Sequence, residues 1–198
     1  MARTTHDDLL QPYSEYLSAR GYTATKIPEA DIMTPDLKLT GKGNDYLNEL
    51  KSPELQPDAT LGLYKFATTN SKLLQFIHTA IKQFTAFDAA HEKPWVMTFA
   101  SSHFQLNWHS LFEAMGGGSV VDGKVIADWT NTEAFRRWNK NRYAVDLYVW
   151  IQVSDEAGPY QASFFTNERT PHRALVDALV GDLRALPVST ADTNWLLM

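Results

Sequence analysis

Apolar and polar positions along the first hundred residues repeat with two different periods. Between residues 5 and 20, and again between 71 and 91, large apolar side chains recur every three or four positions. That spacing places them on one face of a helix, and Gly21 supplies a natural C-terminal end for the first helix. Short segments rich in threonine or in alternating apolar residues lie between and after these helices and are typical of strands. The predicted strands cover residues 22–27, 36–40, 45–51 and 95–99.

The pattern after residue 100 is less regular and predicts shorter elements. Three glycines at positions 116–118 follow a short apolar segment, and we interpret them as a flexible turn. A further turn is predicted at 155–159. Residues 52–70 hold prolines and a glycine without a firm period, which predicts a long loop. The elements predicted in this half are helices at 104–115, 131–142 and 171–186 and strands at 144–153 and 160–165.

The size and composition of the chain indicate one folded unit. A length of 198 residues suits one domain. Hydrophobic residues make up 44% and charged residues 21% of the chain, which argues against a disordered chain or a coiled coil. We predict an α/β fold in a single domain of residues 1–198. Its core covers about 5–100, and about 101–198 form a helical and β-hairpin extension.

Cysteine usage and charge exclude several classes of site and partner. The chain has no cysteine, so it has neither disulfides nor thiolate metal sites. The charged residues His6, Asp7 and Asp8 interrupt any apolar signal core, and no apolar run approaches the ~18 residues of a spanning helix. We therefore expect a cytoplasmic protein with no membrane partner. A net charge of −5 argues against non-specific coating of nucleic acid but permits a local basic patch.

One predicted hairpin gathers three charged residues. Glu49 and Lys51 are two apart in a strand, so they face the same side. If the turn over 41–44 is centred between positions 42 and 43, Asp36 lies directly opposite Glu49. Their Cβ atoms would then be about 5 Å apart.

Two readings of this group remain open. Two carboxylates placed so close repel each other unless a cation lies between them, and a divalent ion would supply that charge. Lys51 on the same face would then orient or deprotonate an attacking water. The alternative is a surface hairpin in which Lys51 pairs with Asp36 or Glu49, a contact worth under about 1 kcal/mol.

The motif that begins at Pro35 resembles a known signature. Pro35-Asp36 followed by Glu49-Leu50-Lys51 is similar to the PD-(D/E)xK signature of the restriction-endonuclease-like superfamily. The common core of that superfamily is helix, three strands, helix, strand. The predicted elements over about 5–100 follow the same order. The resemblance therefore implies a restriction-endonuclease-like core over about half of the chain.

The resemblance also implies a role for each residue of the motif. Asp36 and Glu49 would be metal ligands, with the Leu50 backbone carbonyl as a further ligand, and the cofactor would be Mg2+ or Mn2+. Lys51 would lie near the attacking water. In some members a glutamine on the following helix reaches the site, and Gln83 would take that place. The alternative for Gln83 is a solvated polar residue.

The densest basic stretch lies in the predicted polar helix at 131–142. Arginine binds phosphate in a bidentate manner, and the interleaved Trp138 or Tyr143 would stack on a base. The alternative is a solvated helix face with one buried tryptophan. The residues proposed to contact nucleic acid are Arg136, Arg137, Lys140 and Arg142, together with Gln83.

The six histidines show no metal-binding spacing. His103 and His109 are six apart rather than four, and His6, His78, His91 and His172 are scattered along the chain. We interpret all of them as structural or exposed side chains.

These observations predict a metal-dependent nuclease that hydrolyses phosphodiester bonds, with DNA as the expected partner. Symmetric cutting of a duplex needs two active sites, which favours a homodimer. Two alternatives stay open. One is a catalytically inactive module of the same fold that binds nucleic acid or protein. The other is an RNA-cleaving or toxin-type nuclease with the same site.

Overall fold

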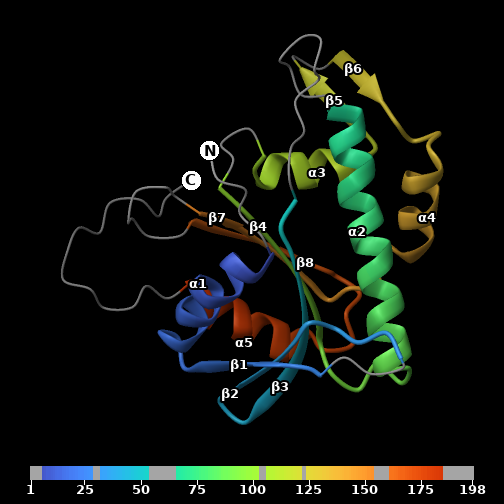
Figure 1. Ribbon diagram of the computed structural model, residues 1–198. Coiled ribbons are helices and arrows are strands. Elements are labelled where there is room, and N and C mark those ends of the chain that lie inside the picture. The colour runs from blue at the N-terminus through green and yellow to red at the C-terminus, as the bar shows by residue number, and fades with distance from the viewer. Residues whose placement is uncertain are drawn as a thin grey trace.

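The computed structural model shows a mixed α/β protein with a six-stranded, mostly antiparallel sheet (Figure 1). Five helices lie in the part of the chain that the structure describes. None of these helices is long and apolar enough to cross a membrane. The described residues are 6–28, 32–53, 66–102, 106–121, 124–153 and 161–184.

The strands of the main sheet follow one another across the sheet in the same order as along the chain. Six of the helices and strands precede residue 102 and seven follow it. In chain order they are α1 (His6–Ser18), β1 (Tyr22–Lys26), β2 (Leu37–Gly41), β3 (Asn44–Lys51), α2 (Phe66–Phe87), β4 (Trp95–Ser101), α3 (Trp108–Gly116), β5 (Gly118–Val121), β6 (Lys124–Asp128), α4 (Glu133–Asn141), β7 (Leu147–Gln152), β8 (Gln161–Thr166) and α5 (Arg173–Arg184).

The main sheet has the strand order β1-β2-β3-β4-β7-β8. The central pairs β3–β4 and β4–β7 are parallel, and the outer pairs are antiparallel. One face packs against α1 and α5, and the other packs against α2, α3 and α4. β3 is therefore an inner strand, covered by helices on both faces.

The first six elements appear in the predicted order, helix, three strands, helix and strand, although the bounds of the second helix differ. α2 begins at Phe66 rather than 71, so the end of the predicted loop over 52–70 is helical. Thr68, Thr69 and Asn70 are weak helix formers, and their context overrides that preference. α2 ends at Phe87 because the Asp88 carboxylate accepts N–H groups of the following turn. Residues 54–65 of the predicted loop lie outside the described residues.

The turn between β2 and β3 confirms the predicted centre of the hairpin. Lys42 has φ 50° and Gly43 has φ 80°, the left-handed pair that a two-residue type I′ turn requires. Gly41 pairs with Asn44, and Leu37 pairs with Asn48. The next pair outward, Asp36 and Glu49, is therefore brought together by the register.

In the second half, the predicted strands at 144–153 and 160–165 are β7 and β8, which extend the main sheet. The glycines at 116–118 end the helix before them, as predicted, but they do not form one turn throughout. Gly117 has φ 78° and caps α3, and Gly118 begins the small β5–β6 hairpin. A Cβ on Gly117 would lie 2.6 Å from the Thr130 side chain, so this turn is tightly packed. The predicted turn at 155–159 lies outside the described residues, as do the first positions of the helix predicted at 104–115.

Side chains along β3 alternate between the two faces of the sheet. Tyr46 and Leu50 enter the apolar cluster under α1 and α5, and Leu47 enters the cluster under α2. Glu49 and Lys51 have the same parity as Leu47 and follow it on the α2 face. The sheet therefore carries a carboxylate and an ammonium group on a face that is otherwise apolar at this point.

Candidate functional site

The candidate active site lies where β2 begins and β3 ends. Asp36 immediately precedes β2. Glu49 and Lys51 are the last two residues of β3 whose side chains lie on the α2 face of the sheet. The Glu49 side chain has no exposed surface, whereas Asp36 and Lys51 are 23% and 21% exposed. A buried carboxylate thus lies behind two groups that solvent can reach.

The two carboxylates are held by reciprocal backbone contacts. The Asp36 N–H donates to Glu49 Oε2 at 3.0 Å, and the Leu50 N–H donates to Asp36 Oδ2 at 2.9 Å. Lys51 Nζ forms an ion pair with Glu49 Oε1 and lies 3.6 Å from Asp36 Oδ2. The structure therefore brings together the three residues that the sequence placed on one face of the hairpin.

Burial gives Glu49 an unusual acidity. Loss of solvent raises the pKa of Glu49 to about 7, the Asp36 carboxylate adds to the rise, and Lys51 opposes it. The register partner of Glu49 on β4 is Met97, an apolar side chain that offers no compensating donor. At neutral pH the group is therefore poised between its protonated and ionised forms, and a further cation would favour the ionised one.

The opposite face of β3 is fixed by buried hydrogen bonds. Asn48 Nδ2 donates to Thr98 Oγ1 at 2.7 Å, and the Tyr13 hydroxyl lies 3.0 Å from the same oxygen. These contacts tie β3 to β4 and to α1 directly behind Glu49. The carboxylate is therefore carried by a backbone that is held from three sides.

Leu50 contributes through its backbone. Within a strand, the N–H and C=O of one residue point to the same edge. The Leu50 N–H is directed at Asp36, so its carbonyl faces the Asp36 side of β3. The oxygen donors on this side of the hairpin are thus two carboxylates and one carbonyl.

Gln83 lies on α2 and is half-buried rather than fully solvated. Its Nε2 donates to the Thr34 carbonyl at 2.8 Å, two residues before Asp36. Its Oε1 is buried and has no hydrogen-bond partner among the described residues. Gln83 therefore connects α2 to the segment that carries Asp36.

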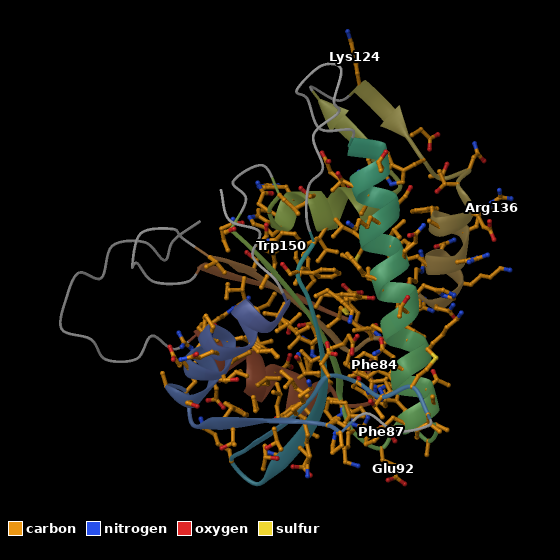
Figure 2. All side chains as sticks on the ribbon, viewed as in Figure 1. Phe84, Phe87, Glu92, Lys124, Arg136 and Trp150 are labelled. Carbon is orange, nitrogen blue, oxygen red and sulfur yellow. The ribbon has the colours of Figure 1, made fainter. Side chains whose placement is uncertain are left out.

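The basic stretch forms the outer surface of α4 and the turn after it. Arg136 points away from the molecule (Figure 2), and Arg137 pairs with Glu133 one turn earlier. Trp138 is buried under the helix, so it cannot stack on a base. The predicted contacts Arg136, Arg137, Lys140 and Arg142 are all exposed, and Tyr143 is 40% exposed.

A second polar cluster joins residues that are remote in the sequence. His91 Nε2 lies 2.7 Å from Asp146 Oδ2, and the His91 and His172 rings are in edge contact with centroids 5.0 Å apart. One potential ligand atom from each of the three residues lies within 4.8 Å of the others. The sequence interpretation missed this cluster, since no spacing or motif connects positions 91, 146 and 172.

Among the described residues, two polar groups are therefore candidates for holding a cation, one of oxygen donors and one of imidazoles with a carboxylate. Comparisons with protein-family models, curated proteins and solved structures found no match for this chain.

Proposed function

We propose that this protein is a metal-dependent nuclease with a restriction-endonuclease-like core. The observation that carries the proposal is the buried Glu49 carboxylate, which lies beside Asp36 and Lys51 at the end of β3. A surface ion pair would not require burial of an acid to the point where its pKa rises to about 7. The element order and the Pro35–Lys51 motif are consistent with that superfamily.

The residues at this site fit a hard divalent cation. The positive charge of Lys51 does not fully offset the effects of burial and of the Asp36 carboxylate on Glu49. The neighbouring donors are carboxylate and carbonyl oxygens, the ligands that Mg2+ and Mn2+ prefer. Asp36, Glu49 and the Leu50 carbonyl would hold the ion. When bound, it supplies the positive charge that polarises a phosphodiester and stabilises the leaving oxygen.

Lys51 is the group that would act on the attacking water. Its Nζ lies between the two carboxylates and is reachable from solvent. Once a cation neutralises Glu49 and Asp36, the Lys51 ammonium is no longer needed for that purpose. As an ammonium it can then orient the water, and only after giving up a proton to solvent could the neutral amine accept the proton of the water. Gln83 would act through position 34, by holding the segment that carries Asp36.

The proposed substrate is DNA, bound in part by the exposed cations of α4. Arg136, Arg137, Lys140 and Arg142 offer a basic surface on a chain that is otherwise acidic. If duplex DNA is cut symmetrically, two copies of the site must act together, and we then propose a homodimer. Sedimentation of the protein with and without duplex DNA measures that association.

The experiment that tests the function is cleavage of plasmid, single-stranded DNA and RNA in parallel, with Mg2+, Mn2+ or a chelator. We expect metal-dependent cleavage that Asp36→Asn abolishes. Asp45→Asn is the matched control, because Asp45 is a partly exposed aspartate on the same hairpin, paired with Lys38. Binding without cleavage would favour an inactive module, and cleavage of RNA alone would favour the RNA-cleaving alternative. Equal activity in wild type and Asp36→Asn would contradict the proposed site.

A further inference from the structure

We propose that His91, Asp146 and His172 form a second cation site, selective for a divalent transition ion of the Zn2+ class. The three residues come from the connection between α2 and β4, the residue before β7, and the residue before α5. The site is separate from the proposed nuclease centre and does not depend on it.

The donor set favours a divalent transition ion. Two imidazoles and one carboxylate are ligands that Zn2+ uses in three-residue sites, and a hard ion such as Mg2+ does not select imidazole. One ligand atom of each residue already lies within 4.8 Å of the other two. Zinc binds such nitrogen and oxygen atoms at about 2.0–2.2 Å, so its ligands lie about 3.3 Å apart.

Hydrogen bonds with neighbouring groups orient the side chains of the cluster. Asp146 Oδ2 accepts the Trp95 N–H at 2.7 Å, and Asp146 Oδ1 accepts the Thr170 hydroxyl. The His172 Nε2–H donates to the His91 carbonyl at 2.9 Å, which leaves a lone pair on His172 Nδ1. Metal ligands are commonly oriented by such outer contacts, and a carbonyl partner fixes the tautomer that can bind.

The burial of the three residues permits a bound ion. The Asp146 side chain has no exposed surface, whereas His91 is 23% exposed and His172 is half-buried. A cation could reach the imidazoles from solvent and have the buried carboxylate behind it. Three protein ligands leave one tetrahedral position for water.

The position of the cluster keeps it apart from the carboxylate site. Asp146 is hydrogen-bonded to Trp95 at the start of β4, whereas Glu49 lies beside Met97, two residues further along that strand. Trp95 and Met97 are about 7 Å apart at the usual rise of a strand. The two groups share no residue, so each can be removed by substitution of its own side chains.

Metal binding must displace one hydrogen bond of this cluster. The His91 Nε2–H donates to Asp146 Oδ2 at 2.7 Å, and an ion bound to both atoms would take the place of that proton. His91 would then carry its proton on Nδ1 as a neutral ligand. The alternative is that no ion binds and that the cluster only joins three loops by hydrogen bonds. The experiment must distinguish this state from the metal-bound one.

Zinc titration of the full chain by calorimetry is the direct test. The background should be Asp36→Asn with Glu49→Gln, which removes the oxygen site. We expect one Zn2+ per chain and no comparable heat with Mg2+. His172→Ala should weaken zinc binding by at least about 100-fold, and Thr170→Val, which acts through Asp146, by about 10- to 100-fold. His109→Ala is the matched control, because His109 is exposed and lies outside the cluster.

A spectroscopic measurement on the unaltered protein guards against variants that fail to fold. Co2+ bound by two imidazoles and a carboxylate in a four-coordinate site should give strong visible absorption that stoichiometric Zn2+ removes. Absence of that absorption, or zinc affinity unchanged in His172→Ala, would overturn the proposal and leave the cluster as a hydrogen-bonded tie. Cleavage activity enters neither measurement, so this result is independent of the nuclease test.

Discussion

The two polar clusters differ in how the chain assembles them. Asp36, Glu49 and Lys51 lie on one hairpin, and a two-residue turn sets their register. His91 and Asp146 meet only because β4 and β7 are neighbours in the sheet. A site built within one hairpin can be deduced from sequence spacing, whereas a site built between distant strands requires the topology.

The same clusters also differ in the number of donors that surround their buried carboxylates. Asp146 accepts hydrogen bonds from Trp95 and Thr170 and contacts His91, so its oxygens are well supplied with donors. Glu49 receives one backbone N–H and the Lys51 ion pair, beside a second carboxylate that repels it. The comparison indicates that the Asp146 carboxylate is held in place by its donors before any ion binds, whereas the Glu49 carboxylate has fewer donors and a like charge beside it.

The largest expected effect concerns Lys51. If Lys51 positions or activates the water, Lys51→Ala should slow single-turnover cleavage by about 100- to 10,000-fold, equivalent to roughly 3–5 kcal/mol on the barrier. Binding of DNA should change little. The measurement is the cleavage rate with saturating metal.

Lys38→Ala is the control for that prediction, since Lys38 pairs with Asp45 on the same hairpin and is 43% exposed. It should cost under about 1 kcal/mol of stability and nothing in rate. Lys51→Arg sharpens the test because arginine keeps the charge but does not give up a proton. Wild-type rates in both Lys51 variants would remove Lys51 from the active site.

The next effect concerns the stability of the metal-free protein. Since the pKa of Glu49 is raised in the folded state, its protonated form favours folding, and that contribution is lost as the pH rises through about 7. Glu49→Gln cannot ionise. It should therefore be more stable than wild type at about pH 8, by up to about 3 kcal/mol, and nearly equal at about pH 4.

Urea unfolding at both pH values, with a chelator present, measures this difference. Glu15→Gln is the matched control, because Glu15 is exposed on α1 and the substitution makes the same chemical change at the surface. A gain of stability that is the same at both pH values would show that ionisation of Glu49 is not the cause.

A smaller effect separates a buried aspartate from an exposed one. Thr170→Val removes the hydroxyl that donates to buried Asp146, which should lower the free energy of unfolding by about 2 kcal/mol. Thr40→Val removes the equivalent donor to partly exposed Asp45 and should cost under about 0.5 kcal/mol. Equal costs in urea unfolding would contradict the structural role assigned to Asp146.

The smallest effect tests a region outside both clusters. Replacing the exposed cations of α4 and its following turn by alanine should weaken DNA binding about tenfold. The slope of log K against the logarithm of the salt concentration should become shallower by roughly one unit for each phosphate that is no longer bound. Arg173→Ala, on the opposite face of the sheet, should leave the slope unchanged. A slope that does not change in the multiple variant would identify α4 as a solvated face. The residues replaced together are Arg136, Arg137, Lys140 and Arg142.

The sequence predicted the parts of the fold that depend on local pattern. The hairpin register followed from the turn at Lys42–Gly43, and the convergence of Asp36 with Glu49 followed from the register. The start of α2 was missed because Thr68 and Thr69 disfavour a helix on their own. The roles of the site residues stay predictions, since side-chain proximity does not measure catalysis.

The features that sequence reasoning missed depend on distant contacts. The β5–β6 hairpin was missed because Gly117 serves as a packed helix cap against Thr130 and Phe135, which a run of glycines does not reveal. The contact of His91 with His172 depends on the order of strands in the sheet. That order is set by packing of whole elements, and short-range spacing does not encode it.

The β2–β3 hairpin also bears on the order in which the chain folds. A hairpin with a two-residue turn closes in about 1–10 μs, whereas β7 can join β4 only after the chain between Ser101 and Leu147 has been synthesised. At about 5–20 residues per second, the end of β4 at Ser101 follows position 51 by roughly 2.5–10 s. During that interval Glu49 lacks its cover, and its carboxylate is free to ionise in water. The cost of burying it therefore arises when α2 and β4 dock, which makes docking, rather than hairpin closure, the pH-sensitive step of folding.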